Sequence, residues 1–141
     1  MDKERIYIKI DEMDQYLREI DEIMPSSSTE YIHDLVKRRA LERLLQITIE
    51  AVMDISAILV KEMKLGLPYQ EEDFLDKMSG TVLNPDLVMK LRKMKGFRNV
   101  LVHGYSQIDN QRVYEIFTQD LGDITLFKQA VIEFLESQDD L

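Results

Sequence analysis

Cysteine is absent from this chain of 141 residues. Its absence excludes disulfide bonds and thiolate metal sites, and agrees with a reducing cytoplasm, where we expect the protein to reside. With 5 glycines and 3 prolines, the composition favours long regular elements over loops. No apolar run approaches the roughly 18 residues of a membrane helix, and the charged N-terminus MDKERIYIKIDEMD lacks the apolar region of a signal peptide. We therefore expect a protein without membrane contact.

Basic residues are too few to balance the acidic ones, and the net charge is −9. Taken alone, this charge argues against a nucleic-acid partner, because affinity for phosphates depends on cations. Their distribution is uneven, however. Residues 87–108 contain no acid and five cations, which are Lys90, Arg92, Lys93, Lys95 and Arg98. This segment carries +5 in a chain of −9, so the rest carries −14. Such a basic patch is often only a solvated helix face.

Apolar residues that recur in steps of three and four predict an all-α protein. One such series spans residues 6–24, and the capping-box pair Ser27 and Glu30 predicts a second, long helix that runs to about residue 65. A short helix at 71–78, a helix beginning at Asn84, a short helix after Asp109 and a last helix follow. We expect a single domain over residues 1–141, an antiparallel bundle of about five to six helices.

The predicted long helix is apolar on more than one face. One stripe contains Leu41, Leu44, Thr48, Ala51, Ile55 and Ile58, and a second contains Leu45, Ile49, Val52, Leu59 and Met63. A helix that packs against one layer needs a single stripe. Two stripes indicate either a central position or a second chain, and we predict a homodimer.

The stretch GFRNVLVHGY at residues 96–105 contains the candidates for chemistry. The imidazole of His103 can take a proton from a ribose 2′-hydroxyl or return one to the leaving oxygen. The guanidinium of Arg98 matches phosphate oxygens and stabilises the charge that develops on them. Metal-free cleavage of RNA suits this pair, so we predict neither a metal ion nor a cofactor. The alternative is structural, a histidine satisfied at a helix end and an arginine bound to a carbonyl or carboxylate.

Arg98 and His103 are five residues apart, which is about 140° around an ideal helix. A regular helix through both residues would therefore separate them. Gly104 could end the helix and free the His103 ring to turn. Alternatively, a dimer could bring the motifs of two chains to one cleft. The spacing leaves both arrangements open.

The string RNVLVHGY at residues 98–105 resembles the R-N-x-x-x-H-x-Y signature of HEPN-domain proteins, specifically the HepT-type toxins. Residues 38–56 resemble the long second helix of that family, and residues 85–105 resemble its motif helix. The resemblance implies an all-α homodimer that acts as a metal-independent endoribonuclease, with paired motifs in a cleft at the dimer interface. It assigns Arg98 and His103 as the catalytic pair.

The resemblance also implies a partner. HepT toxins occur with a small nucleotidyltransferase antitoxin of the MNT type, which uses ATP to adenylylate the motif tyrosine, here Tyr105. The added phosphate and nucleoside would repel RNA and block the cleft. Asn99 would support the catalytic pair. Three further candidates for the cleft are Arg39, Glu50 and Asp54.

The basic run before the motif is predicted to hold RNA phosphates through Lys90, Arg92, Lys93 and Lys95. The acidic remainder should weaken affinity for long RNA and make it strongly salt-dependent. A small structured RNA such as a tRNA end is therefore the expected substrate. The alternative function is a non-catalytic dimeric subunit of a nucleotidyltransferase, in which the same cleft binds nucleotide or the partner's active site.

Overall fold

The computed structural model describes residues 2–66, 72–103 and 108–139, without side-chain placement at 72, 73, 103 and 139. The elements in these ranges are α1 (Lys3–Ile23), α2 (Ser28–His33), α3 (Leu35–Glu62), α4 (Glu72–Lys77), α5 (Pro85–His103), α6 (Asn110–Glu115), the π-helical η1 (Ile116–Asp120) and α7 (Gly122–Asp139). The only β-type pairing among them is an isolated bridge between Ser79 and Leu83. No helix in the described part of the chain is long and apolar enough to cross a membrane. The predicted all-α class is confirmed.

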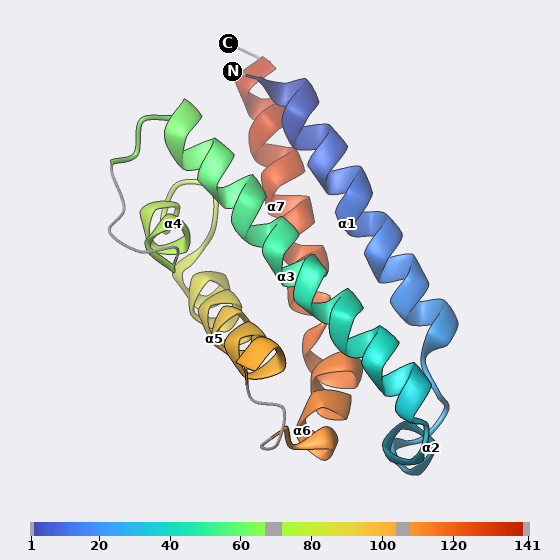
Figure 1. Cartoon of the computed structure of the whole chain (residues 1–141). Coiled ribbons are helices and arrows are strands. Elements are labelled where there is room, and N and C mark those ends of the chain that lie inside the picture. Colours follow the sequence, from blue (N-terminus) through green and yellow to red (C-terminus); the bar gives the residue numbers. More distant parts are fainter. Residues whose placement is uncertain (1, 67–71, 104–107, 140–141) are drawn as a thin grey trace.

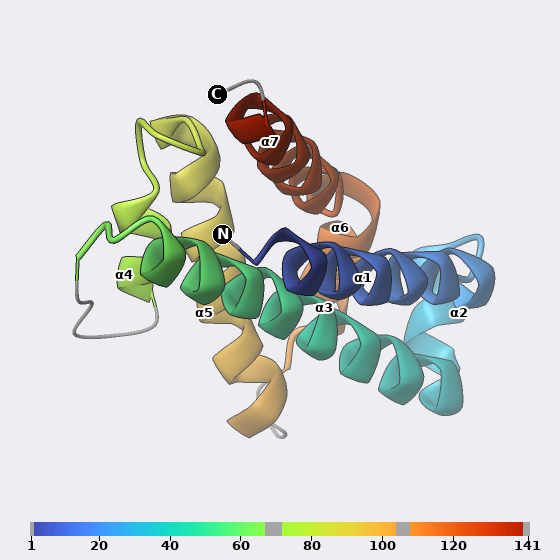
Figure 2. The same cartoon turned by 90° about the horizontal axis from the view of Figure 1, so that it is seen from above.

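Helix α3 lies at the centre of the bundle (Figures 1 and 2). It runs antiparallel to α1 and also contacts α2, α4 and α5. Both predicted stripes of α3 are largely buried; Leu45, Ile55 and Leu59 have no exposed surface. Because the central position alone accounts for two buried faces, the stripes do not require a second chain.

The prediction of a single helix over residues 27–65 is wrong, because the helix is interrupted at Asp34. This residue ends α2 and caps α3 with extended backbone angles, φ −102° and ψ 92°. Its carboxylate accepts a hydrogen bond from the amide of Lys37 at 3.0 Å. A short acidic side chain that satisfies a free helix amide competes with continued helix. The cap at Ser27 is present, since the amide of Glu30 donates to Oγ of Ser27 at 3.2 Å, but the Glu30 carboxylate accepts from the amide of Ser26 at 3.2 Å and not from that of Ser27. This break raises the helix count above the five to six expected.

Helix α5 begins as the sequence predicts. The amide of Leu87 donates to Oδ1 of Asn84 at 2.8 Å, and Pro85 is the first helical residue. Buried side chains on its inner face, among them Leu91 and Met94, pack on the core, and the helix contacts α3, α4 and α7. The helix is therefore fixed along one side only.

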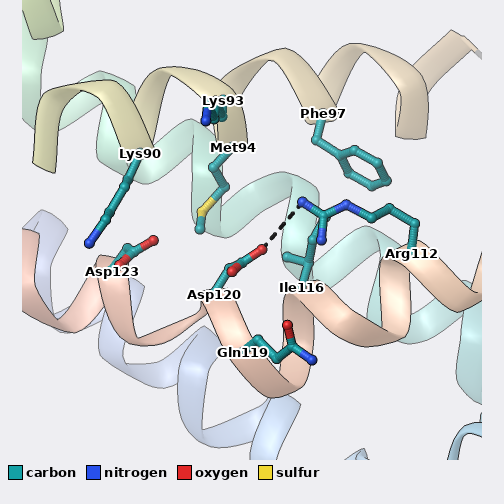
Figure 3. Close-up of a pocket in the computed structure, with 9 residues that line it drawn as sticks. All are labelled: Lys90, Lys93, Met94, Phe97, Arg112, Ile116, Gln119, Asp120 and Asp123. Carbon is teal, nitrogen blue, oxygen red and sulfur yellow. Dashed lines mark ion pairs between the residues drawn. The ribbon is translucent and has the colours of Figure 1, made fainter. Parts of the chain in front are cut away.

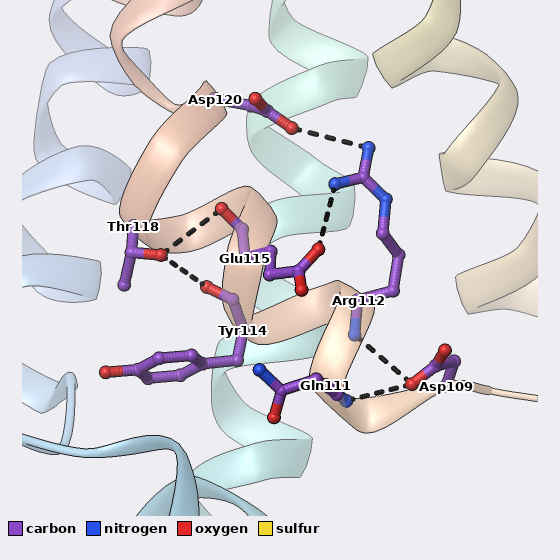
Figure 4. A network of polar contacts seen from close by, with 7 residues as sticks. All are labelled: Asp109, Gln111, Arg112, Tyr114, Glu115, Thr118 and Asp120. Carbon is purple, nitrogen blue, oxygen red and sulfur yellow. Dashed lines mark hydrogen bonds and ion pairs between the residues drawn. The ribbon is translucent and has the colours of Figure 1, made fainter.

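The chain after α5 contains the predicted short helix and a feature that was not predicted (Figure 4). The amides of Gln111 and Arg112 donate to Oδ1 of Asp109 at 3.1 and 3.2 Å, so α6 begins at its expected cap. The helix then widens into η1, where Oγ1 of Thr118 donates to the carbonyl of Tyr114 at 3.1 Å. Single π-turns of this kind are rare and occur often at functional sites.

A buried aromatic cluster joins α2 to α6 and η1. Tyr31 on α2 has no exposed surface, and its ring centroid lies 5.7 Å from that of Tyr114 and 6.1 Å from that of Phe117. Tilted aromatic pairs at such distances are favourable beyond the area that they bury. The short helix α2 thus fixes α6 and η1 relative to α3.

Candidate functional site on helix α5

The predicted catalytic motif occupies the C-terminal part of α5. Arg98 is half-buried, Asn99 is exposed and His103 is the last residue of the helix. Tyr105 lies outside the described residues. Because α5 continues through both Arg98 and His103, their positions are about 140° apart around its axis. One copy of α5 therefore does not present both positions on one face.

The two faces of α5 differ in character. Arg98 follows Leu91 by seven residues and Met94 by four, so it extends the buried inner face. Asn99 belongs to an outer strip whose positions recur in steps of three and four, which are Met89, Arg92, Gly96, Asn99 and His103. Met89 is 59% exposed, and a Cβ added at Gly96 would meet nothing within 4 Å. The outer strip is thus open and partly apolar.

Two of the predicted RNA-binding cations are held by carboxylates. Nζ of Lys90 lies 3.2 Å from Oδ2 of Asp86, and Nη1 of Arg92 lies 3.2 Å from Oδ2 of Asp76 on α4. The hydrogen bond to Asp86 raises the pKa of Lys90. Both pairs are about half exposed, and such pairs contribute little to stability. A phosphate could therefore replace either carboxylate at small cost.

The other two cations differ in accessibility. Lys95 is only 8% exposed, whereas Lys93 is exposed and forms no ion pair with the described residues. The surface that the basic run offers in one copy thus consists of Lys90, Arg92 and Lys93.

The remaining candidates lie on α3 and form contacts apart from α5. Nη1 of Arg39 lies 2.9 Å from Oε2 of Glu42, which is itself only 7% exposed. Asp54 lies 3.9 Å from Nζ of Lys9 on α1. Glu50 is half-buried. No group of three or more His, Asp or Glu side chains in the described residues is arranged to hold a metal ion.

A pocket of about 340 Å³ opens between α5 and the α6–η1–α7 segment (Figure 3). Its lining consists of Lys90, Lys93, Met94, Phe97, Arg112, Ile116, Gln119, Asp120 and Asp123. Met94 and Ile116 are buried and form an apolar base, while Nη2 of Arg112 lies 3.5 Å from Oδ2 of Asp120. The lining combines three cations with two carboxylates, and the neighbouring Asp86 and Glu115 pair with Lys90 and Arg112.

The carboxylate of Asp123 in the pocket is partly buried. Burial raises the pKa of Asp123; Lys90 opposes the shift, and Asp120 and Asp86 add to it. Figure 3 shows the Lys90 side chain directed toward Asp123 across the gap between α5 and α7. The pocket therefore brings charges of both signs next to apolar surface.

Sequence reasoning missed the far wall of this pocket. Arg112, Gln119, Asp120 and Asp123 belong to no motif, and the π-helical turn moves the residues that follow it relative to a regular helix. The cap at Asp109 predicts that Arg112 is helical but does not indicate the direction in which it points. Only the packing of η1 against α5 reveals that these side chains share a site.

Similarity to known proteins identifies the family of this chain. The family model of HepT-like ribonucleases matches residues 13–131. The chain belongs to the HepT-like ribonuclease family. A tRNA nuclease HepT from Aphanizomenon flos-aquae is 26% identical over 131 residues, which cover 92% of this chain and 89% of the relative. An mRNA nuclease HepT from Shewanella oneidensis is 27% identical over 88 residues, 62% of this chain and 66% of the relative.

Solved structures share the fold of this HepT-like chain. A tri-AMPylated HEPN toxin from Shewanella oneidensis, in complex with an MNT antitoxin, aligns with a TM-score of 0.85 at 22% identity, over 91% of this chain and 96% of that chain. The cytosolic protein YutE from Bacillus subtilis aligns with a TM-score of 0.83 at 18% identity, over 98% and 93%. The resemblance to HEPN proteins that the sequence indicates is confirmed.

Proposed function

We propose that this chain is a metal-independent endoribonuclease toxin that cleaves RNA in a cleft between two copies. The observation that supports it best is the complete Arg98-to-His103 motif at the end of α5 in a member of the HepT-like ribonuclease family. His103 acts as general acid and base, Arg98 binds the reacting phosphate, and Asn99 orients one of these groups.

The reaction is a transesterification. The ribose 2′-oxygen loses its proton to an imidazole and attacks phosphorus, and the bond from phosphorus to the 5′-oxygen breaks. The 5′-oxygen takes a proton from an imidazolium, which leaves a 2′,3′-cyclic phosphate and a 5′-hydroxyl. The guanidinium of Arg98 stabilises the non-bridging oxygens, whose charge grows in the transition state.

The second copy packs against the outer strip of α5 in this proposal. Helices associate along seams in which positions recur every seven residues, and Met89, Gly96 and His103 have that spacing. The open surface at Gly96 allows close approach of another backbone, and the adjoining Val100 is 37% exposed. Such a seam would bring the C-terminal ends of two α5 helices together, with the Asn99 and His103 positions of both copies at the interface.

A small structured RNA of the tRNA class is the proposed substrate. The net charge of −9 disfavours long RNA, which would contact the acidic body as well as the basic face. The relative described as a tRNA nuclease also aligns over more of this chain than the relative described as an mRNA nuclease.

A nucleotidyltransferase of the MNT type is the proposed antitoxin, and it acts by adenylylating Tyr105. The similar fold of an AMPylated toxin bound to an MNT antitoxin supports this partner. Tyr105 follows His103 by two residues, so the added phosphate and nucleoside would stand at the cleft and repel RNA.

The nuclease is tested with unmodified protein, purified without its partner, and tRNA in EDTA. Wild-type protein should produce 2′,3′-cyclic phosphate ends, and His103→Gln should cleave at least about a hundredfold more slowly. Lys61→Gln, on the exposed surface of α3, is the control that should retain activity. Intact tRNA after incubation with wild-type protein would instead favour the non-catalytic subunit of a nucleotidyltransferase.

The silencing step has its own test. With the cognate nucleotidyltransferase and ATP, mass spectrometry should find AMP on Tyr105, and cleavage should stop. Tyr105→Phe should stay unmodified and active. Modification elsewhere with Tyr105 untouched would remove this part of the proposal.

A further inference from the structure

We propose that the pocket between α5 and η1–α7 binds one unpaired guanine of the RNA and thereby selects where the chain is cut. This inference rests on the ribonuclease function proposed above. The pocket adjoins the motif, because Phe97 immediately precedes Arg98 in the chain. Phe97 and His103 are six residues apart, about 9 Å along the helix axis and about 120° around it. A base held at Phe97 would therefore lie a few nucleotides from the scissile phosphate.

The size and base of the pocket suit a single base. Its volume of about 340 Å³ lies at the lower end of the range of roughly 300–1,000 Å³ for small-molecule sites. Met94 and Ile116 are 6% and 3% exposed and form an apolar surface, and the half-buried ring of Phe97 stands at one end of it (Figure 3). Proteins that bind unpaired nucleotides stack bases on aromatic rings of this kind.

The polar groups select guanine among the four bases. A carboxylate accepts hydrogen bonds only, and guanine offers two neighbouring donors, N1–H and the N2 amino group, to the carboxylate of Asp120. A guanidinium such as that of Arg112 donates to the O6 and N7 of guanine. Nη2 of Arg112 lies 3.5 Å from Oδ2 of Asp120, and Nη1 lies 3.5 Å from Oε2 of Glu115 (Figure 4). The three side chains are 50%, 36% and 39% exposed, so both ion pairs are weak enough for Arg112 to exchange them for the base. Gln119 adds an exposed amide at the rim.

The cations on α5 place the phosphates of the same strand. Lys90 and Lys93 lie one turn apart at the edge of the pocket. A strand that follows them would pass Phe97 and reach the motif at the end of α5. The lysines thus bind phosphates of any sequence, and the pocket recognises one base.

Binding is tested with 2′-O-methyl hexauridylates, which lack the attacking hydroxyl and cannot be cleaved. Each oligonucleotide carries one G, A, C or U at its centre, and fluorescence anisotropy gives its Kd. Wild-type protein should bind the G oligonucleotide about tenfold more tightly than the others. Phe97→Leu and Asp120→Asn should reduce this preference to less than about twofold. Equal Kd values for all four oligonucleotides with wild-type protein would overturn the inference.

Matched controls separate recognition from folding. Phe134→Leu removes the same ring from another half-buried position on α7, and Asp11→Asn neutralises an exposed aspartate on α1; both should keep the preference. Gln119→Ala changes an exposed residue and should weaken the preference without lowering the melting temperature. A preference that survives in Phe97→Leu, Asp120→Asn and Gln119→Ala would show that the base is read elsewhere.

A cleavage map distinguishes this inference from the nuclease proposal. Sequencing of the tRNA fragments should place a guanine at one fixed position near the cut, and Phe97→Leu should spread the cuts over other sequences. Cleavage by wild-type protein with no base preference would overturn the pocket and leave the nuclease. Absence of cleavage together with guanine preference in the binding assay would refute the nuclease and support the pocket.

Discussion

The α1–α3 pair and helix α5 use their polar side chains in opposite ways. Inside α3, Oγ1 of Thr48 donates to the carbonyl of Leu44 at 2.6 Å, and Oγ of Ser56 donates to that of Val52 at 2.7 Å, so these buried hydroxyls bond to their own helix. On α5, by contrast, Lys90, Arg92 and Lys93 line pockets, and Asn99 is exposed. The α1–α3 pair is thus a framework whose buried hydroxyls form hydrogen bonds within their own helix, whereas α5 presents polar groups that a ligand can reach.

This difference has a structural basis in how each helix is covered. Helix α3 is buried on two faces, but α5 is packed on one face only. Lys93 lines two pockets, one facing α6–η1–α7 and one facing the end of α4. A helix with one packed face can be positioned firmly and still offer two sides to other molecules.

Leu45→Ala should give the largest effect, because it removes a fully buried side chain from the centre of α3. Lost burial and the resulting cavity should lower the free energy of unfolding by about 2–5 kcal/mol, measured by urea denaturation. Met89→Ala on α5, where the side chain is 59% exposed, should change it by less than about 0.5 kcal/mol. Similar losses at the two positions would mean that α5 is as enclosed as α3.

Gly96→Gln should reduce cleavage about a hundredfold while leaving the fold intact. A Cβ at this position meets nothing within 4 Å, and replacing a helical glycine favours the helix by up to about 1 kcal/mol. The longer side chain should nevertheless block the second copy, so analytical ultracentrifugation should find a monomer. Gly96→Ala is the matched control and should keep most of the dimer. A monomeric Gly96→Gln protein with full activity would rule out the shared cleft.

Much of the framework could be predicted from the sequence because it rests on local signals. The caps at Ser27, Asn84 and Asp109 are hydrogen bonds between residues two or three apart, and each occurs as expected. The break at Asp34 escaped notice because an aspartate inside a helical pattern can either face solvent or cap a new helix. Only the turn of the chain that packs Tyr31 against η1 determines which occurs.

The candidate site was predictable only where a motif marks it. The pattern of residue types identifies Arg98 and His103. Their spacing, however, indicates only that a continuous helix would place them on different faces. The pocket depends on residues far apart in sequence, such as Phe97 and the η1 residues that line it together, and on a π-helical turn that has no clear sequence signal. Local rules therefore predict the helices better than they predict the groups that meet between them.

Tyr31→Phe tests the contact between α2 and the α6–η1 segment and should raise stability by about 0.5–1 kcal/mol at pH 7. The hydroxyl is buried without a hydrogen-bond partner among the described residues, which is unfavourable. Burial raises the pKa of Tyr31, with Glu42 adding to the shift. Above about pH 10 the unfolded chain ionises while the folded chain does not, so wild-type stability should fall with rising pH. In thermal melts between pH 8 and 11, the melting temperature of the variant should therefore fall less than that of the wild-type protein. Lower stability of the variant at pH 7 would show that the hydroxyl is paired.

Lys93→Gln should have the smallest effect, a loss of about threefold in affinity for 2′-O-methyl RNA at moderate salt. Because Lys93 is exposed and forms no ion pair with the described residues, its charge can bind phosphate without first leaving a carboxylate. Removing one phosphate contact should make the slope of log K against log salt shallower by about 0.7. The loss should be equal for all four oligonucleotides, since the lysine contacts no base. Lys61→Gln on α3 removes the same charge from the framework and should leave the slope unchanged. Equal changes in both variants would mean that RNA responds to the total charge of the protein and that α5 has no special place in binding.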